Sequence, residues 1–198
     1  MPLRISYMLL AVVLMSAGGC MRGAQSVGYR TVLPVVGSNR ELARQANSCG
    51  VASARAGDLK AAEVAFREAL RADLSCAAAH CNLGNILLSR GQLYEAALEF
   101  AFAAKVDSRA VEPKINLGRL YETAGWHAAA VEEYEKALSL DRDNTEAMGR
   151  LAFVCLQSEG NSQSAASLLR GLAQANRNSR WKRWASRELD RSTGLASQ

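Results

Sequence analysis

A repeat with a period of 34 residues dominates this chain and limits what it can fold into. Gly84, Phe100 and Asp107 each have a counterpart 34 positions later, and most of these positions also match 34 positions earlier. The matching positions in the three clear copies are Gly50, Gly84 and Gly118; Gly57, Gly91 and Gly125; Ala62, Ala96 and Ala130; Phe66, Phe100 and Tyr134; Ala69, Ala103 and Ala137; and Asp73, Asp107 and Asp141. Such a period is typical of solenoids, in which each copy is one helical hairpin that packs against its neighbours.

The residue types at these positions fit pairs of closely packed helices. Glycine within a helix costs about 1 kcal/mol relative to alanine, a cost that is tolerated where a second backbone must come close. The next glycine of each copy can adopt the positive φ that ends a first helix, and the aromatic residue fills the space between two helices. We therefore expect an all-α chain whose first helices cover about residues 39–56, 76–90, 110–124 and 144–158.

A fourth, degraded copy follows the three clear ones. Leu151 and Ala152 keep the period, whereas Ala165 and Leu169 come one position late. This shift predicts a single insertion in the turn between residues 158 and 162.

The two ends of the repeat array carry their own signals. Ser38 with Glu41 has the pattern of a capping box and predicts the start of the first helix. At the other end, Asn178 and Ser179 are expected to cap a last helix that contains Trp181, Trp184 and Leu189. A solenoid needs such a final helix because the apolar face of its last repeat has no further neighbour.

The spacing and the residue types together resemble the tetratricopeptide repeat (TPR). The resemblance implies an all-α, right-handed superhelical solenoid of antiparallel helix pairs with a C-terminal capping helix. The expected divisions are a signal peptide at 1–19, a flexible tether at 20–37, the solenoid at 38–192 and a disordered tail at 193–198. Within the solenoid, the expected repeats are 43–76, 77–110, 111–144 and the degenerate 145–179, followed by a capping helix at 179–192.

The first twenty residues have the pattern of an export signal. A positive charge at Arg4 precedes an apolar stretch, residues 5–15, which is too short to span a membrane. The small residues before Cys20 resemble the lipobox of bacterial lipoproteins, with Ala17 where that family prefers Leu. The resemblance implies that Cys20 is lipidated, and Met21 after it resembles the signal for sorting to the outer membrane. Ordinary signal-peptide cleavage, which leaves Cys20 unmodified, is the alternative.

Four cysteines follow Cys20. Cys49 and Cys155 lie at repeat positions that are apolar or aromatic in other copies, so we expect both to be buried packing residues. Cys76 and Cys81 flank the start of a helix, which provides too few ligands at too wide a spacing for a metal site. We therefore predict no metal and no cofactor. Export would permit a disulfide between Cys76 and either Cys49 or Cys81, but reduced thiols are the favoured state.

The motifs of catalytic sites are missing from the sequence. His80 lies where a large residue packs at the head of a first helix, and His127 opens a second helix. No Ser or Cys is spaced from a base as in known nucleophile arrangements. The glycines recur every 34 residues and not in a phosphate-binding G-x-G-x-x-G block. We therefore predict that the protein is not an enzyme.

Basic residues are concentrated near the C-terminus. The net charge is +5, and the seven basic and two acidic residues from Arg170 onward account for all of this excess. A basic surface beside two Trp residues can contact an anionic surface or an acidic partner through Arg180, Lys182 and Arg183. Nucleic acid is not expected as a partner of an exported protein. The alternative is that the Trp residues face inward as a cap and the charges keep the surface solvated.

The TPR resemblance also implies a binding surface, because the first helices of such repeats line a concave groove that receives a peptide. Asn82 and Asn116 match a groove position whose amide can pair with the backbone of an extended peptide. The matching positions in the outer copies are Ser48 and Arg150, and Glu112 stands where the carboxylate-clamp type of TPR has Lys. The predicted groove residues are Asn82, Asn85, Asn116, Arg119, Arg55 and Glu122.

These observations predict a non-catalytic scaffold that binds a protein or peptide partner and is tethered to the bacterial envelope through an N-terminal lipid, facing the periplasm. The outline resembles bacterial TPR lipoproteins that help to assemble a pilus, a secretion channel or other envelope complexes. The resemblance supports this class of protein, not one particular machine. The alternative is an envelope enzyme or enzyme subunit, whose active site would break the repeat pattern, as only the region near Gly160 and the basic tail do.

Overall fold

The computed structural model describes residues 38–157, 162–175 and 180–195, and these parts contain nine helices. The predicted signal peptide and tether, the core of the predicted turn insertion and the Asn178–Ser179 cap lie outside the described residues. The helices are α1 (Arg40–Arg55), α2 (Leu59–Ala72), α3 (Ala77–Ser89), α4 (Leu93–Val106), α5 (Glu112–Thr123), α6 (His127–Leu140), α7 (Thr145–Gln157), α8 (Ser162–Gln174) and α9 (Arg180–Leu195).

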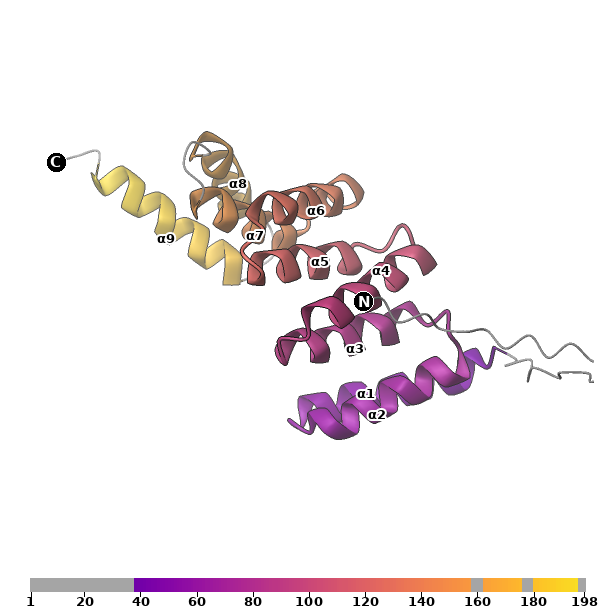
Figure 1. Cartoon of the computed structure of the whole chain (residues 1–198). Helices are drawn as coiled ribbons and strands as arrows, with labels where there is room; N and C mark the ends of the chain where they lie inside the picture. Colours follow the sequence, from indigo (N-terminus) through magenta and orange to yellow (C-terminus); the bar gives the residue numbers. More distant parts are fainter. Residues whose placement is uncertain (1–37, 158–161, 176–179, 196–198) are drawn as a thin grey trace, which may run out of the picture. The chain divides into compact units, whose positions relative to one another are not determined.

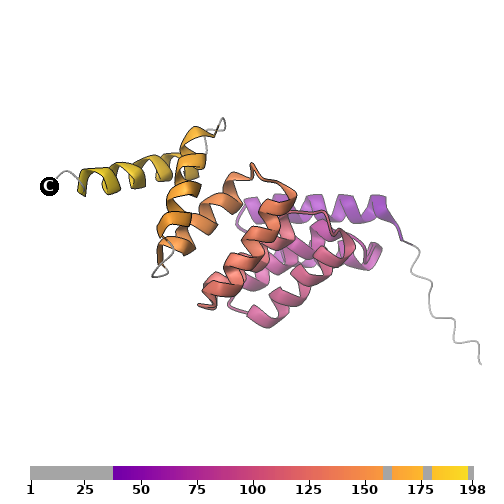
Figure 2. The same ribbon diagram turned by 90° about the horizontal axis from the view of Figure 1, so that it is seen from above.

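The first eight helices pack as four antiparallel pairs, and α9 packs on α7 and α8 (Figures 1 and 2). The first helices of neighbouring pairs, α1, α3, α5 and α7, contact one another in sequence order, and α7 also contacts α9. Within the described chain, the second helices make no comparable contacts with each other. The first helices and α9 therefore lie on the inner side of the stack, which we call the inner face.

A glycine of the first helix meets an aromatic ring of the second helix in each clear repeat. A methyl group at Gly84 would lie 2.6 Å from the nearest ring atom of Phe100, and the same conflict exists between Gly118 and Tyr134. These two rings are fully buried. Glycine is required here because the helices approach so closely that a Cβ has no space.

The turn inside each repeat also depends on glycine. Gly57, Gly91 and Gly125 have φ angles of 84°, 76° and 77°. The backbone N–H of the next residue closes the turn, as when Trp126 donates to the carbonyl of Tyr121 at 2.8 Å. This is the Schellman arrangement of a helix end, and it confirms the predicted end of the first helix.

The recurring aspartate shapes the connection from one repeat to the next. The carboxylates of Asp73, Asp107 and Asp141 each accept a hydrogen bond from the backbone N–H two residues later, at 2.9, 3.0 and 3.3 Å. Such a bond stabilises a turn by imitating a backbone contact. The residue therefore recurs because every repeat must turn at the same point.

The fourth repeat keeps the core with different residues. Ala152 replaces the helix glycine and Leu169 replaces the aromatic residue, and both belong to one buried cluster. Ala152 is larger than the glycine of the other repeats, and Leu169 is smaller than their aromatic residue, so the two changes compensate each other in volume. Ala165 and Leu169 are buried, as the predicted one-residue shift requires.

Both ends of the repeat array differ from prediction in detail. The cap of α1 is Asn39, whose Oδ1 accepts from the backbone N–H of Leu42 at 3.0 Å, so the predicted Ser38 cap is wrong by one residue. Ser38 instead lies close to the carboxylate of Asp73, and Glu41 pairs with Arg44 at 2.6 Å. At the other end, α9 continues to Leu195, three residues beyond the expected limit of 192.

Candidate functional site

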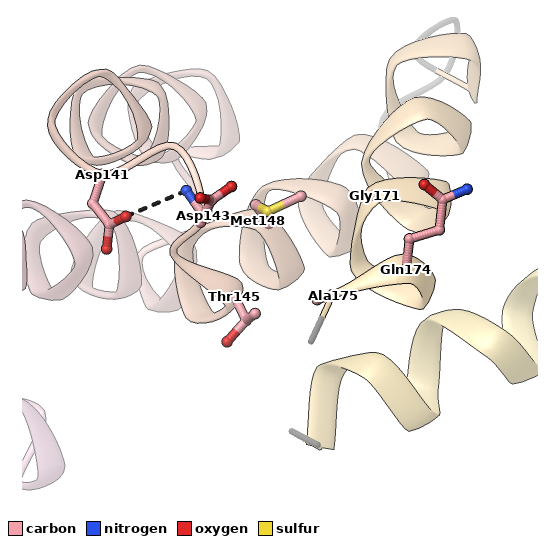
Figure 3. A pocket seen from close by; sticks show the side chains of 7 residues that line it. All are labelled: Asp141, Asp143, Thr145, Met148, Gly171, Gln174 and Ala175. Carbon is pink, nitrogen blue, oxygen red and sulfur yellow. Dashed lines mark hydrogen bonds between the residues drawn. The ribbon is translucent and has the colours of Figure 1, made fainter. Parts of the chain in front are cut away.

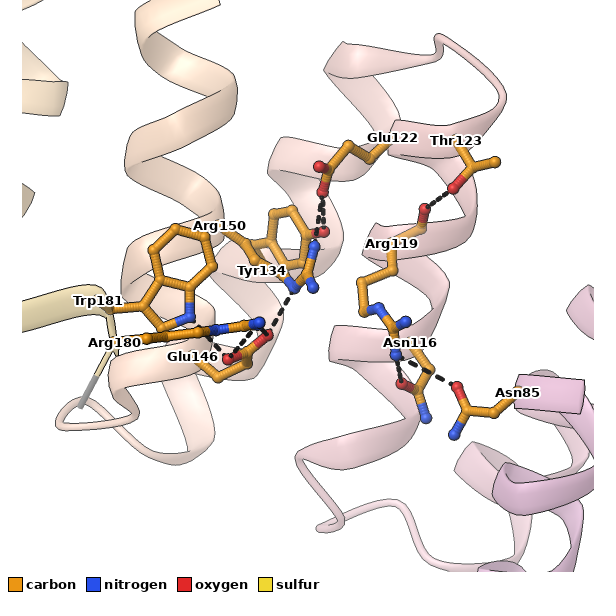
Figure 4. Close-up of polar contacts among 10 residues, drawn as sticks. All are labelled: Asn85, Asn116, Arg119, Glu122, Thr123, Tyr134, Glu146, Arg150, Arg180 and Trp181. Atoms are coloured by element: carbon orange, nitrogen blue, oxygen red, sulfur yellow. Dashed lines mark hydrogen bonds and ion pairs between the residues drawn. The ribbon is translucent and has the colours of Figure 1, made fainter. Parts of the chain in front are cut away.

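Polar side chains join each first helix to the next along the inner face, and Figure 4 shows these contacts from α3 to α9. Every step from α1 to α9 has at least one such contact, and we call the set the polar ladder. Its contacts are Asn82 Nδ2 to Asn47 Oδ1 at 2.9 Å, Arg119 to Asn85 Oδ1 at 3.3 Å, Arg150 to Glu122 at 3.2 Å and Arg180 to Glu146 at 2.7 Å. Five of the six predicted groove residues lie in or beside this ladder.

Asn82 and Asn85 lie one turn apart on α3 and are half-buried. Asn82 donates from its amide and Asn85 accepts through its oxygen. The side-chain oxygen of Asn82 and the side-chain NH₂ of Asn85 have no partner among the described residues. One acceptor and one donor are therefore left facing the inner side.

Asn116 is more enclosed than the sequence suggested. Its side-chain oxygen accepts from Arg119 at 3.3 Å, its side chain lies close to the thiol of Cys81, and only 8% of its surface is exposed. Burial, together with the nearby charge of Arg150, lowers the pKa of the Arg119 guanidinium. Asn116 thus holds Arg119 in position, and the Arg119 guanidinium makes the contact from α5 to α3.

Glu122 is fixed by two neighbours. It accepts from the hydroxyl of Tyr134 at 2.7 Å and from Arg150 at 3.2 Å. Burial and the hydrogen bond to Glu122 raise the pKa of Tyr134 above its ordinary range, so the phenol stays protonated. The sixth predicted residue, Arg55, is exposed at the end of α1 and has no partner among the described residues.

Glu146 organises the last step of the ladder and was not predicted. It accepts from Trp181 Nε1 at 2.7 Å, from Arg150 at 2.8 Å and from Arg180 at 2.7 and 3.0 Å. Burial opposes ionisation of this carboxyl, but the hydrogen bonds from Trp181 and Arg150 outweigh it and lower its pKa. The only sequence signal was the opposite charge of Glu146 and Arg150 four residues apart on one helix.

The capping helix packs its two partly buried Trp residues against the core, in agreement with the cap interpretation. Trp181 and Trp184 pack against the cluster that contains Leu169 and Leu172, and a Cβ at Gly149 would collide with the Trp181 ring. Of the three cations predicted to contact an anionic surface, Arg180 binds Glu146, and Lys182 donates to the carbonyl of Ala175 at 2.7 Å. Two of these three side chains therefore already serve the fold.

The cysteines divide by position. Cys155 is buried as predicted, but Cys49 is exposed, so the prediction for Cys49 is wrong. Cys49 lies on α1, where no described repeat precedes it to cover a position that is covered in later copies. All four described cysteines are free thiols, and burial raises the pKa of Cys81 to about 12.

His80 is held inside the repeat array. Its Nδ1 lies 2.6 Å from Glu99 and its Nε2 lies 3.0 Å from the carbonyl of Leu74, and its ring stacks on Phe102. The described parts contain no group of three or more His, Cys, Asp or Glu residues that could hold a metal ion. They also include no helix with the length and apolar character needed to cross a membrane.

A separate hollow of about 490 Å³ lies between the α6–α7 turn and α8 (Figure 3). Asp141 and Asp143 line one side, and Gly171 and Gln174 line the other. Asp141 accepts from the backbone N–H of Asp143 at 3.3 Å and from the Asn144 side chain at 3.1 Å. The hollow is formed where the turn between the third and fourth repeats passes α8. The carboxylate of Asp141 is engaged by hydrogen bonds within that turn.

The stack of antiparallel helix pairs, with a glycine–aromatic contact in each clear repeat, defines an all-α TPR superhelix. The family model described as tetratricopeptide repeat matches residues 121–186. Among curated protein sequences, none matched the chain.

Three solved structures illustrate the likeness of the fold. Pseudomonas aeruginosa pilF is 23% identical, with 70% of this chain and 63% of that chain covered and a TM-score of 0.64. YrrB, described as a TPR protein with an unusual peptide-binding site, is 21% identical, with 70% and 71% covered and a TM-score of 0.57. The first TPR of Spaghetti (RPAP3), bound to the HSP90 peptide SRMEEVD, is 17% identical, with 61% and 97% covered and a TM-score of 0.57. At such identities the likeness establishes the fold alone.

Proposed function

We propose that the protein is a non-catalytic interaction scaffold that binds an extended segment of a partner protein along its inner face. The observation that carries this proposal is the pair Asn82 and Asn85. Their free acceptor and free donor lie one helical turn apart, each held in place by a bond to a neighbouring first helix. An extended backbone offers N–H and C=O groups that such a pair can satisfy without reading the side chains. Groups that are already ordered lose less entropy on binding.

The likeness to known structures supports the same function. YrrB and the first TPR of Spaghetti are described as having a peptide-binding site or a bound peptide. Their fold is shared by this chain, and the inner face of this chain offers polar groups in fixed positions.

The test begins with peptides selected from a random display library on the purified full chain. Binding of the selected peptides is then measured by fluorescence anisotropy for wild type, Asn82→Ala and Asn47→Ala. Both variants lose the same ladder bond, but only Asn82→Ala loses the free acceptor. Because a hydrogen bond contributes about 0.5–1.5 kcal/mol, we expect Asn82→Ala to bind roughly 2–10 times more weakly than wild type. Asn47→Ala should lose clearly less affinity, because it removes the bond that orders Asn82 but keeps the acceptor itself. Failure to select any peptide, or equal effects of the two variants, would refute the proposal.

We also propose that the chain is exported and anchored to the bacterial envelope through a lipid on Cys20, facing the periplasm. Support comes from the signal pattern and the small residues before this cysteine. In that position the scaffold could aid assembly of a pilus, a secretion channel or another envelope complex. Metabolic labelling with a clickable fatty acid should mark wild type and leave Cys20→Ser unlabelled. Equal labelling of both, or an unlabelled but processed wild type, would exclude the lipid anchor.

A further inference from the structure

The inner face ends in a hollow of about 390 Å³ between α5, α7 and α9. Its walls combine aromatic rings with guanidinium groups and a single carboxylate. The lining residues are Glu122, Arg150, Phe153, Arg180, Trp181, Trp184 and Arg187. No sequence motif pointed to this combination, because its residues come from three helices.

The aromatic wall is fixed in position. The ring of Trp184 lies edge-on to Trp181 at 5.4 Å and to Phe153 at 6.3 Å between centroids. Trp181 is held by its hydrogen bond to Glu146 and by the guanidinium groups of Arg150 and Arg180 over its ring, at 5.9 and 5.1 Å (Figure 4). Phe153 remains 36% exposed. An incoming apolar side chain can therefore contact Phe153 and Trp184 without rearranging the wall.

The charges of the hollow do not balance. Arg150 and Arg180 are paired with Glu122 and Glu146. Arg187 also lines the hollow, and it has no partner among the described residues. A neighbouring hollow, lined by Lys182, Arg183, Ser186 and Arg187, extends the basic surface along α9. The unbalanced positive charge thus lies beside the aromatic wall, at Arg187.

We propose that this hollow binds an aromatic side chain of the partner segment, with an Asp or Glu side chain two residues away pairing with Arg187. The inference rests on the proposed function, because it assigns a chemical class to the segment bound on the inner face. Residues two apart in an extended segment point the same way and lie about 6.5–7 Å from each other. An aromatic ring contributes affinity through burial and edge contacts. A carboxylate paired with a guanidinium adds a charge-assisted bond.

An anionic membrane is the other possible source of negative charge. The hollow faces the inner side of the helix stack, between α5, α7 and α9, and its Trp rings are packed against the core. A flat lipid surface has poor access to such a site, whereas an extended segment can enter it.

The experiment uses the full chain and synthetic peptides that are acetylated and amidated, so that no terminal carboxylate is present. The probe is a selected peptide that contains Glu-Ser-Phe, and its partners contain Gln-Ser-Phe or Glu-Ser-Ala. Binding is measured by anisotropy for wild type, Arg187→Gln, Phe153→Ala and Arg191→Gln. Arg191 is the matched control, because its loss removes the same charge from α9 but it pairs with Glu188 and does not line the hollow.

We expect enrichment of a carboxylate two residues from an aromatic residue among peptides selected on wild type. Arg187→Gln should weaken Glu-Ser-Phe binding about tenfold, as expected for loss of a bond to a charged group, and leave Gln-Ser-Phe unchanged. Phe153→Ala should weaken both of these peptides, and Arg191→Gln should weaken neither. Thermal melts followed by circular dichroism check that each variant is folded.

Several results would overturn the inference. Equal losses from Arg187→Gln and Arg191→Gln would show a general charge effect. Binding that depends on Asn82 but not on Arg187 or Phe153 would leave the scaffold function standing and remove this site. No selected peptide at all would end both proposals. Binding to phosphatidylglycerol vesicles that requires Arg187, with no binding of Glu-Ser-Phe, would assign the basic surface to lipid.

Discussion

The contact between Gly84 and Phe100 should make Gly84→Ala destabilising, although alanine favours helices. The new Cβ would lie 2.6 and 2.8 Å from two atoms of the Phe100 ring. That ring is fully buried and cannot move into solvent. Overpacking of this kind costs about 1–3 kcal/mol, and the gain in helix propensity returns only about 1 kcal/mol. We therefore expect a net loss of about 1 kcal/mol in the free energy of unfolding, with an upper limit near 2 kcal/mol.

The fourth repeat suggests how to restore this stability, because it combines Ala152 with Leu169 in one buried cluster. Phe100→Leu alone should be destabilising, but by less than the roughly 3–5 kcal/mol typical of Phe→Ala. In the double variant, the smaller leucine leaves room for the alanine methyl group. We expect the double variant to be more stable than the sum of the single losses predicts, by about 1 kcal/mol.

Urea unfolding followed by far-UV circular dichroism gives the four free energies of this cycle. Gly171→Ala is the matched control, because the only close atom there is the flexible end of Met148. That variant should be neutral or gain as much as about 1 kcal/mol. Stabilisation by Gly84→Ala, or additivity of the two changes within about 0.5 kcal/mol, would refute the argument.

Three further predictions address the turn, the thiols and the capping helix. Gly125→Ala places a side chain at a φ of 77°, so a loss of about 1–2 kcal/mol is expected in the same urea assay; an unchanged midpoint would contradict it. Exposed Cys49 should react with a maleimide at pH 8 much faster than buried Cys155 or half-buried Cys81, because the pKa of Cys81 is raised to about 12; a different order of labelling in peptide mapping would contradict this. The pKa of Glu146 in the folded state is below its ordinary value of 4.5. The ionised carboxylate therefore stabilises the fold fully at pH values above 4.5, and this stabilisation is lost as the pH falls through the folded-state pKa. Trp fluorescence should report loosening of α9 in that acid range for wild type, and the change should be smaller for Glu146→Gln. Glu68→Gln, on the exposed side of α2, is the control and should behave as wild type.

The sequence was sufficient to predict the core, because core positions must repeat. Ala62, Ala96 and Ala130 are fully buried, and each occupies the same place in its own repeat. The predicted first helices agree with α1, α3, α5 and α7 to within two residues at every end. Periodicity predicts such features well, since the same packing problem is solved several times along one chain.

Predictions failed where a residue lacks the neighbours that its repeat position implies. Cys49 occupies a position that is apolar in later copies, but in the first repeat no described helix covers it. The polar ladder could not be predicted for a different reason. Its bonds join residues 28–35 positions apart, and their formation depends on rotamers that the sequence does not specify.

Positions that share one place on the inner face but change residue type are the better guide to binding. Asn85, Arg119 and Phe153 are spaced 34 residues apart, so they occupy equivalent places on α3, α5 and α7. At these equivalent places the inner face changes from an amide to a guanidinium and then to an aromatic ring. Since the core residues stay the same over this distance, packing does not require the change. A segment bound along this face would therefore meet backbone-directed amides at α3 and the aromatic and basic hollow at α9, and this order determines which part of the segment lies at each end of the face.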